Sequence, residues 1–241
     1  TTQRMRRQGH LALVLLLGST ACLQLATAGV PPNVTAGEMA ALPVYCPDTM
    51  GFKYGDAYSN TSPRAKHWVG MMGPGFWAMH HYCWALLSEG RARAPAITTE
   101  QRRFLYESAI ADATYVVLNT KPDFILLPEI LVRIGEWQLK INRIPQAYDA
   151  FMQARTAKPD YWPAYSKWAE LQISQKLLSQ ARKTLEEGLA QAPDASELIR
   201  LYRSVGGDPA PFVAAAAASA AAVAAAAAQA ERAASAGSAP Q

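Results

Sequence analysis

The sequence contains little cysteine and histidine and has no marked excess of charge of either sign. Only 3 cysteines and 4 histidines occur in 241 residues, and 23 basic residues stand against 19 acidic ones, for a net charge of +4. Three of the arginines lie in the segment 1–28, which contains no acid, so the rest of the chain has a net charge of only +1. Nucleic-acid binding needs a clustered basic face. The charge balance therefore argues against nucleic acid as a partner.

The apolar run at the N-terminus, residues 11–23, is too short to span a membrane. It is about thirteen residues long, whereas a transmembrane helix needs about 20. Three arginines precede the run, and the small residues Ala26 and Ala28 follow it, which is the pattern of a secretory signal peptide. We therefore expect residues 1–28 to be removed as a signal peptide and the mature protein to be periplasmic or secreted.

A second processing route is open at Cys22. The residues Ser19-Thr20-Ala21-Cys22 resemble the lipobox of bacterial lipoproteins, in which the cysteine becomes the acylated first residue. Ser19 departs from that pattern, which prefers leucine at this position. The alternative location is thus a membrane-anchored lipoprotein, and we expect membrane association only if Cys22 is lipidated.

Two cysteines, Cys46 and Cys83, remain after the expected cleavage. Disulfides persist outside the cytoplasm, so one bridge between them is the simplest expectation, with two free thiols as the alternative. The bridge would join the N-terminal segment to the stretch 75–87. On the chain-entropy estimate it would stabilise the fold by about 3 to 4 kcal/mol.

Two adjacent stretches of equal length, 128–161 and 162–195, repeat the same pattern of large and small residues. Large apolar residues recur at equivalent positions of the two stretches, and so do small residues. A proline stands near the end of each stretch. The matching pairs are Leu131 with Tyr165, Ile134 with Trp168, Gly135 with Ala169, Ala147 with Ala181, Phe151 with Leu185, Ala154 with Gly188, and Pro159 with Pro193.

This pattern resembles the tetratricopeptide repeat, a helix-turn-helix unit of about 34 residues. The resemblance implies an all-α solenoid in which the small residues let the two helices of a hairpin approach closely, and the prolines end the second helix. Gln138 and Gln172 stand where the family usually has tyrosine, which leaves the subtype open.

Two such hairpins bury too little surface alone, so we expect further helices around them. Residues 101–124 are predicted to form a second helix of a degenerate hairpin whose first helix covers residues 74–89. Residues 196–205 are predicted to form a cap helix. The expected solenoid spans residues 66–207, after an irregular segment, residues 29–65.

Residues 208–241 form an alanine-rich, low-complexity tail. Alanine has the highest helix propensity, so a helix is expected. A membrane span is not expected there, because alanine is only weakly apolar and Glu231 and Arg232 lie within the run. The simplest interpretation is a helical spacer, and a partner-docking helix is the alternative.

The stretch GFWAMHHYCWALL, residues 75–87, concentrates side chains that carry chemistry. Phe76, Met79 and Cys83 recur at helical spacing and predict a core face. The favoured hypothesis is aromatic packing, with one or both imidazoles of His80 and His81 hydrogen-bonded to the N-terminal segment.

A metal site using His67, His80 and His81, with nearby methionines, is the alternative. Neighbouring residues on a helix point about 100° apart, which argues against a shared ion. The chain also lacks an evident third residue to orient a Cys-His nucleophile. We therefore expect no enzyme activity and no cofactor.

The resemblance further implies a concave groove lined by the first helices of successive hairpins, which takes up a protein or peptide partner. Carried over to this chain, it predicts a partner-binding groove formed by Glu129, Val132, Glu136, Leu139, Lys140, Ser166, Glu170, Ile173 and Ser174. Three of the nine are acidic and one is basic, which suits an apolar partner segment with some basic character.

The sequence thus predicts an exported, non-enzymatic scaffold that binds another protein, with assembly of an envelope complex as one such role. The alternative is a periplasmic metal- or cofactor-handling protein that uses the helix rich in histidine, methionine and cysteine.

Overall fold

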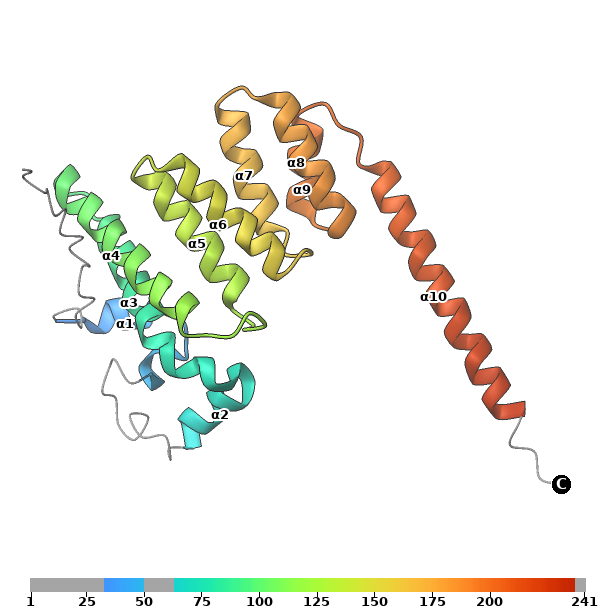
Figure 1. The fold of residues 1–241 in the computed structure, drawn as a ribbon, viewed down its shortest axis with the longest axis horizontal. Coiled ribbons are helices and arrows are strands. Elements are labelled where there is room, and N and C mark those ends of the chain that lie inside the picture. Colours follow the sequence, from blue (N-terminus) through green and yellow to red (C-terminus); the bar gives the residue numbers. More distant parts are fainter. Residues whose placement is uncertain (1–32, 50–62, 237–241) are drawn as a thin grey trace, which may run out of the picture.

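A computed structural model describes residues 33–49 and 63–236, with side-chain detail to residue 232, and all regular elements in this part of the chain are helices (Figure 1). The described residues form three helical hairpins, a cap helix and a long C-terminal helix, preceded by short N-terminal helices. These are α1 (Ala36–Ala40), the 3-10 helix η1 (Cys46–Asp48), α2 (Pro63–Met72), the 3-10 helix η4 (Gly73–Ala78), α3 (Met79–Ala92), α4 (Thr99–Leu118), α5 (Leu127–Lys140), α6 (Ile144–Ala157), α7 (Pro163–Ser174), α8 (Leu178–Gln191), α9 (Ser196–Ser204) and α10 (Ala210–Ala236). The expected all-α solenoid of packed helix pairs is confirmed.

The two repeats of the sequence are the hairpins α5/α6 and α7/α8, and close packing explains their small residues. A Cβ atom on Gly135 would lie 2.6 Å from the ring of Phe151. A Cβ atom on Gly188 would lie 2.9 Å from the side chain of Tyr165. Any larger side chain at these glycines would push the two helices of the hairpin apart.

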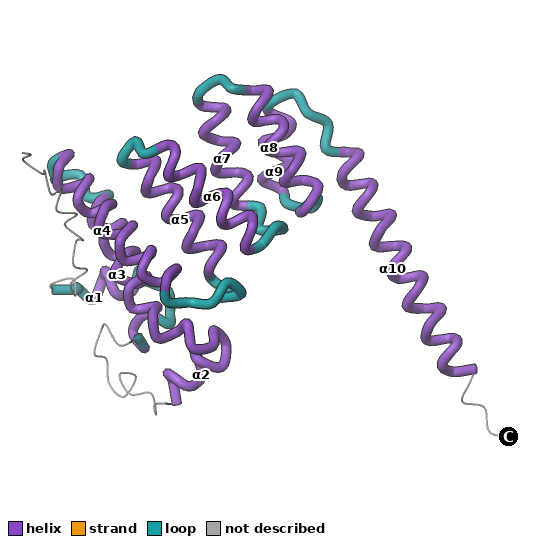
Figure 2. The backbone as a smooth tube through the Cα atoms, viewed as in Figure 1, coloured by secondary structure: helices purple, strands orange, loops and turns teal. Residues whose placement is uncertain are grey.

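In both full repeats a short loop joins the two helices of the hairpin (Figure 2). Asn142 and Lys176 occupy equivalent places in the two repeats, and both adopt the left-handed conformation, with φ of 60° and 61°. A left-handed residue lets the chain reverse soon after a helix ends. Helix α6 ends shortly before Pro159 and α8 ends shortly before Pro193, as the sequence predicts.

The first hairpin, α3/α4, begins later than the sequence suggests. The expected helix from residue 74 is instead the 3-10 helix η4 followed by α3. Gly73, the first residue of η4, takes a positive φ of 67° and marks the break after α2. Gly75 in η4 packs so tightly that a Cβ atom there would lie 2.7 Å from Phe124. Helix α4 starts with a complete capping box between Thr98 and Gln101.

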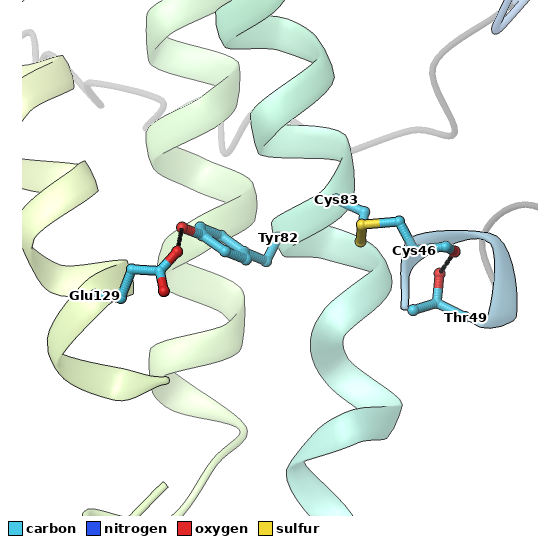
Figure 3. Close-up of a disulfide and its surroundings, with 5 residues drawn as sticks. All are labelled: Cys46, Thr49, Tyr82, Cys83 and Glu129. Atoms are coloured by element: carbon cyan, nitrogen blue, oxygen red, sulfur yellow. Dashed lines mark hydrogen bonds between the residues drawn. A yellow bond between two sulfur atoms is a disulfide. The ribbon is translucent and has the colours of Figure 1, made fainter. Parts of the chain in front are cut away.

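The N-terminal segment, residues 33–49, is joined covalently to the first hairpin. A disulfide links Cys46 in η1 to Cys83 in α3, with 5.7 Å between the two Cα atoms (Figure 3). The predicted bridge is therefore confirmed. Nearby, the Trp68 indole of α2 donates a 2.7 Å hydrogen bond to the buried carboxylate of Asp48, which ties α2 to the same segment.

Helix α10 projects away from the solenoid (Figure 1). Within the described residues, Ala210–Arg232 is the one stretch long and apolar enough to cross a membrane by length and composition, and none of it is buried. Glu231 and Arg232 are the last two residues of this stretch and lie within α10, as the sequence predicts.

Candidate protein-binding groove

A cleft of about 390 Å³ lies between the first helices of the two full repeats, α5 and α7. Its walls carry Glu129, Arg133 and Glu136 from α5 and Lys167 from α7, and Tyr161 and Pro163 close it at the start of α7. Val132 forms part of the lining but is itself only 5% exposed. The cleft thus has polar walls and a small apolar floor.

A larger cleft of about 810 Å³ continues from it toward the N-terminus. It lies between α5, the C-terminal half of α3 and the N-terminal segment, which contributes α1 residues together with Leu42 and Pro43. Glu129 and Arg133 line both clefts. The two clefts therefore adjoin at these side chains. Together they are here called the A-helix groove, after the first (A) helices of the hairpins, and the disulfide-linked segment makes part of its wall.

A ladder of ion pairs crosses this groove from α3 to α7. Arg133 lies 3.5 Å from Glu89 of α3 and 3.8 Å from Glu136 on its own helix. Lys167 of α7 lies 3.8 Å from Glu136 and 3.1 Å from Glu170. Two of these pairs join an acid of one hairpin to a base of the next, so the ladder helps to set how the first helices stand relative to one another.

Two tyrosines interact with Glu129 of the groove. The buried Tyr82 of α3 donates a 2.8 Å hydrogen bond from its hydroxyl to Glu129 of α5 (Figure 3). Tyr161 is partly exposed in the lining, and burial together with the charge of Glu129 raises its pKa to about 12. At neutral pH the Tyr161 phenol is therefore protonated and can donate a hydrogen bond to a bound polypeptide.

The structure divides the nine predicted groove residues into three sets. Glu129, Val132 and Glu136 line the groove, and Glu170 is joined to it through Lys167. Leu139 and Ile173 pack against the core, and Ser166 is buried with its hydroxyl on the Pro163 carbonyl. Lys140 and Ser174, which end their helices, lie outside the groove lining.

Sequence reasoning missed the two cations of the ladder, although a signal for them exists. Arg133 and Lys167 occupy equivalent places in the two repeats, and so do Glu136 and Glu170. Each full repeat thus carries a base followed one helical turn later by an acid, which places both on one helix face. Comparing the repeats at charged positions, as well as at apolar ones, predicts both pairs.

His80 and His81 of the first hairpin pack among aromatic side chains, but their hydrogen-bond partners are not in the N-terminal segment as expected. His81 is buried and its Nδ1 lies 2.7 Å from Oδ1 of Asp112 in α4. His80 places its Nδ1 2.9 Å from the carbonyl of Trp77 in the preceding turn. The expected hydrogen bonds to the N-terminal segment are therefore wrong, because the rings turn toward α4 and the preceding turn.

The two imidazoles also lie closer than a helical wheel suggests, with ring centroids 4.4 Å apart. His67, the third residue of the metal hypothesis, stands in α2 beside Trp68, with 4.9 Å between the ring centroids. In the residues that the structure describes, no group of three or more histidine, cysteine or acidic side chains is arranged to hold a metal ion.

Comparison with protein families agrees with this geometry. Residues 139–204 match the family model described as Tetratricopeptide repeat, a stretch that includes α6, α7, α8 and α9. The match supports a tetratricopeptide repeat protein, and repeats of this family generally mediate protein interactions rather than catalysis. Searches of curated proteins and of solved structures found no match.

Proposed function

We propose that the protein is an exported, non-enzymatic scaffold whose A-helix groove binds a polypeptide segment of another exported protein. The single observation that supports this most strongly is that the two clefts adjoin, with Glu129 and Arg133 in the lining of both. A groove that runs across three hairpins offers the length that an extended chain or a helix needs. A small-molecule site would instead be enclosed by its walls.

The nine sequence-predicted residues, with three acids and one base, suggest a partner with some basic character. The residues that line the groove suggest otherwise. Four acids and four bases line the two clefts: Glu38, Glu89, Glu129 and Glu136, and Arg91, Arg93, Arg133 and Lys167. The groove is thus balanced rather than acidic. A basic residue of the partner would have to compete with Lys167 for Glu136 and Glu170, so apolar and backbone contacts are proposed to dominate.

The disulfide supports the proposed location. Cys46–Cys83 holds a wall of the groove in place, and such bonds persist in oxidising compartments. With the predicted signal peptide over residues 1–28, this favours a periplasmic or secreted protein, with lipidation at Cys22 as the alternative. Mass spectrometry of the mature N-terminus decides between an N-terminus after Ala28 and an acylated Cys22.

The groove is tested by reversing the charge of its acids. The mature chain and the variant Glu136→Lys/Glu170→Lys are used as baits for extract from the native cell envelope. Glu100→Lys, on a fully exposed residue of α4, is the control. We expect the proteins captured by the native chain to be retained by the control and lost from the double variant. An unchanged set of proteins on the double variant would show that the groove is not the binding surface.

A further inference from the structure

A third cleft, of about 530 Å³, lies between the second helices of the two full repeats, α6 and α8, with α7 contributing to its lining. It shares no lining residue with the A-helix groove. Two aromatic side chains, Tyr148 and Trp168, stand together in it with ring centroids 4.9 Å apart. Arg155, Lys183 and Glu187 supply its charged groups. The cleft therefore combines an aromatic surface with two cations and one acid.

Arg155 occupies a position that is part of the hydrophobic core in the second full repeat. Its equivalent in the next repeat is Leu189, which is fully buried. The Arg155 side chain is likewise only 10% exposed. Burial lowers the pKa of its guanidinium, against the opposing effect of nearby acidic groups. A charged group at a core position needs partners, because an unpaired buried charge is strongly unfavourable.

Two of the three nitrogens of this guanidinium have no hydrogen-bond partner within the described residues. Nη1 lies 3.7 Å from Glu187 and 3.6 Å from the sulfur of Met152, and the Tyr165 ring centroid lies 4.5 Å from the guanidinium carbon. Nε and Nη2 are buried and, in this part of the chain, have no hydrogen-bond acceptor.

Nε and Nη2 are the two donors that form the side-on fork of arginine. Their parallel N–H bonds match the two oxygens of one carboxylate, which is why arginine binds carboxylates in a bidentate manner. Lys183 adds a second positive charge to the cleft, and Tyr148 and Trp168 offer an apolar surface beside it. The missing acceptor thus has a definite chemistry, a planar anion attached to an apolar or aromatic body.

We propose that this cleft, here called the Arg155 cleft, binds a carboxylate carried on an aromatic or apolar group. The carboxylate belongs either to a polypeptide, as a chain terminus, or to a free small acid. Access to Nε and Nη2 requires side chains at the rim to rotate. Tyr148, which lines the cleft, is 40% exposed, so it has the freedom to do so. Because the cleft is separate from the A-helix groove, this inference does not depend on the proposed function.

The test uses matched pairs of probes that differ only in charge. N-acetyl-phenylalanine and its amide represent a polypeptide terminus, and benzoate and benzamide represent a free small acid. Each is titrated at millimolar concentration into the ¹⁵N-labelled full chain. Binding is followed at the indole N–H of Trp168, which is assigned with Trp168→Phe. We expect each acid to bind more tightly than its amide, and the tighter of the two acids identifies the source.

Variants locate the binding at the fork. Arg155→Lys keeps the charge but removes the fork, and we expect it to weaken acid binding about tenfold or more. Arg203→Lys, on an exposed residue of α9, is the control and is expected to change nothing. Glu187→Gln removes the acid that competes for the guanidinium, so we expect acids to bind several-fold more tightly to it.

Three results would overturn the proposal: no shift of the Trp168 signal with either acid, equal binding of acids and amides, or unchanged binding in Arg155→Lys. If Arg155→Lys does not fold, the acid affinities of Glu187→Gln and Lys183→Gln test the proposal instead. Both keep the fork, and the proposal requires opposite changes in acid affinity from them, tighter in the first and weaker in the second.

Discussion

The hairpin α3/α4 and the hairpins α5/α6 and α7/α8 have the same two-helix form but are held by different interactions. In the full repeats, small residues such as Gly135 and Gly188 allow close helix contact. The first hairpin instead has a disulfide to the N-terminal segment and a buried His81–Asp112 pair. The difference shows that the end of a solenoid, which lacks a preceding hairpin, needs other interactions to cover it.

Removing the disulfide should have the largest effect and should fall on one region. We expect Cys46→Ala/Cys83→Ala to lower the free energy of unfolding by about 3 kcal/mol, because the unfolded chain gains freedom. Hydrogen exchange measures where protection is lost, which we expect in α3 and not in α7 or α8. Equal loss in all three hairpins would contradict the distinction between them. Under reducing conditions the variant and the native chain should have similar stability.

Gly135 tests the full repeats in the same way. We expect Gly135→Val to lower the free energy of unfolding by about 2 to 3 kcal/mol in a urea titration, because the added atoms collide with Phe151. Gly90→Ala in α3 is the control. A Cβ atom at Gly90 meets nothing within 4 Å, so the higher helix propensity of alanine should leave stability unchanged or raise it. A similar loss in both variants would show that close packing is not the cause.

Asp112 and Asp149 stand at the same place relative to the closing sequences Lys-Pro-Asp of their hairpins, yet only Asp112 is buried. Asp112→Ala leaves the buried Nδ1 of His81 without its partner, so we expect a loss of about 1 to 3 kcal/mol. Asp149→Ala should change stability by less than about 0.5 kcal/mol. Thermal unfolding of the two variants side by side measures the difference, and equal effects would refute a special role for the His81–Asp112 pair.

The smallest predicted effect concerns pH and the N-terminal segment. A hydrogen bond from Arg91 is the main reason that the pKa of Glu38 falls from 4.5 to about 2. A lowered acid pKa adds stability above pH 4.5 that is lost as the pH falls toward 2. Because both side chains are 27% exposed, the contribution should be below about 1 kcal/mol. Glu38→Gln should flatten the loss of stability between pH 4.5 and 2, and an unchanged slope would argue against this pair.

The solenoid was predictable because large and small side chains recur at equivalent positions in the two repeats. A constant offset between equivalent residues predicts both full hairpins, and the closing prolines predict where their second helices end. The disulfide was predictable because only Cys46 and Cys83 remain after the expected cleavage. The break at Gly73 and the helix α2 were not, since a positive φ at one glycine and packing on the N-terminal segment leave no periodic signal.

The groove was only partly predictable. Glu129, Val132 and Glu136 follow from the repeat register, but the wall formed by the N-terminal segment depends on tertiary contacts. The ladder cations could have been found by comparing charged positions across the repeats. Arg155 could not have been found in this way, because its equivalent in the second repeat is Leu189. From the sequence alone, an arginine is expected to be exposed rather than to occupy a core position.

Site-specific photocrosslinking in the native envelope tests the central claim most directly. A photoreactive amino acid is placed at Leu86 and at Tyr161, at the two ends of the A-helix groove, and at Phe104, which is 64% exposed outside it. We predict that Leu86 and Tyr161 crosslink to the same protein and that Phe104 does not. Crosslinks from Phe104 alone, or different proteins from the two groove positions, would contradict a single binding groove.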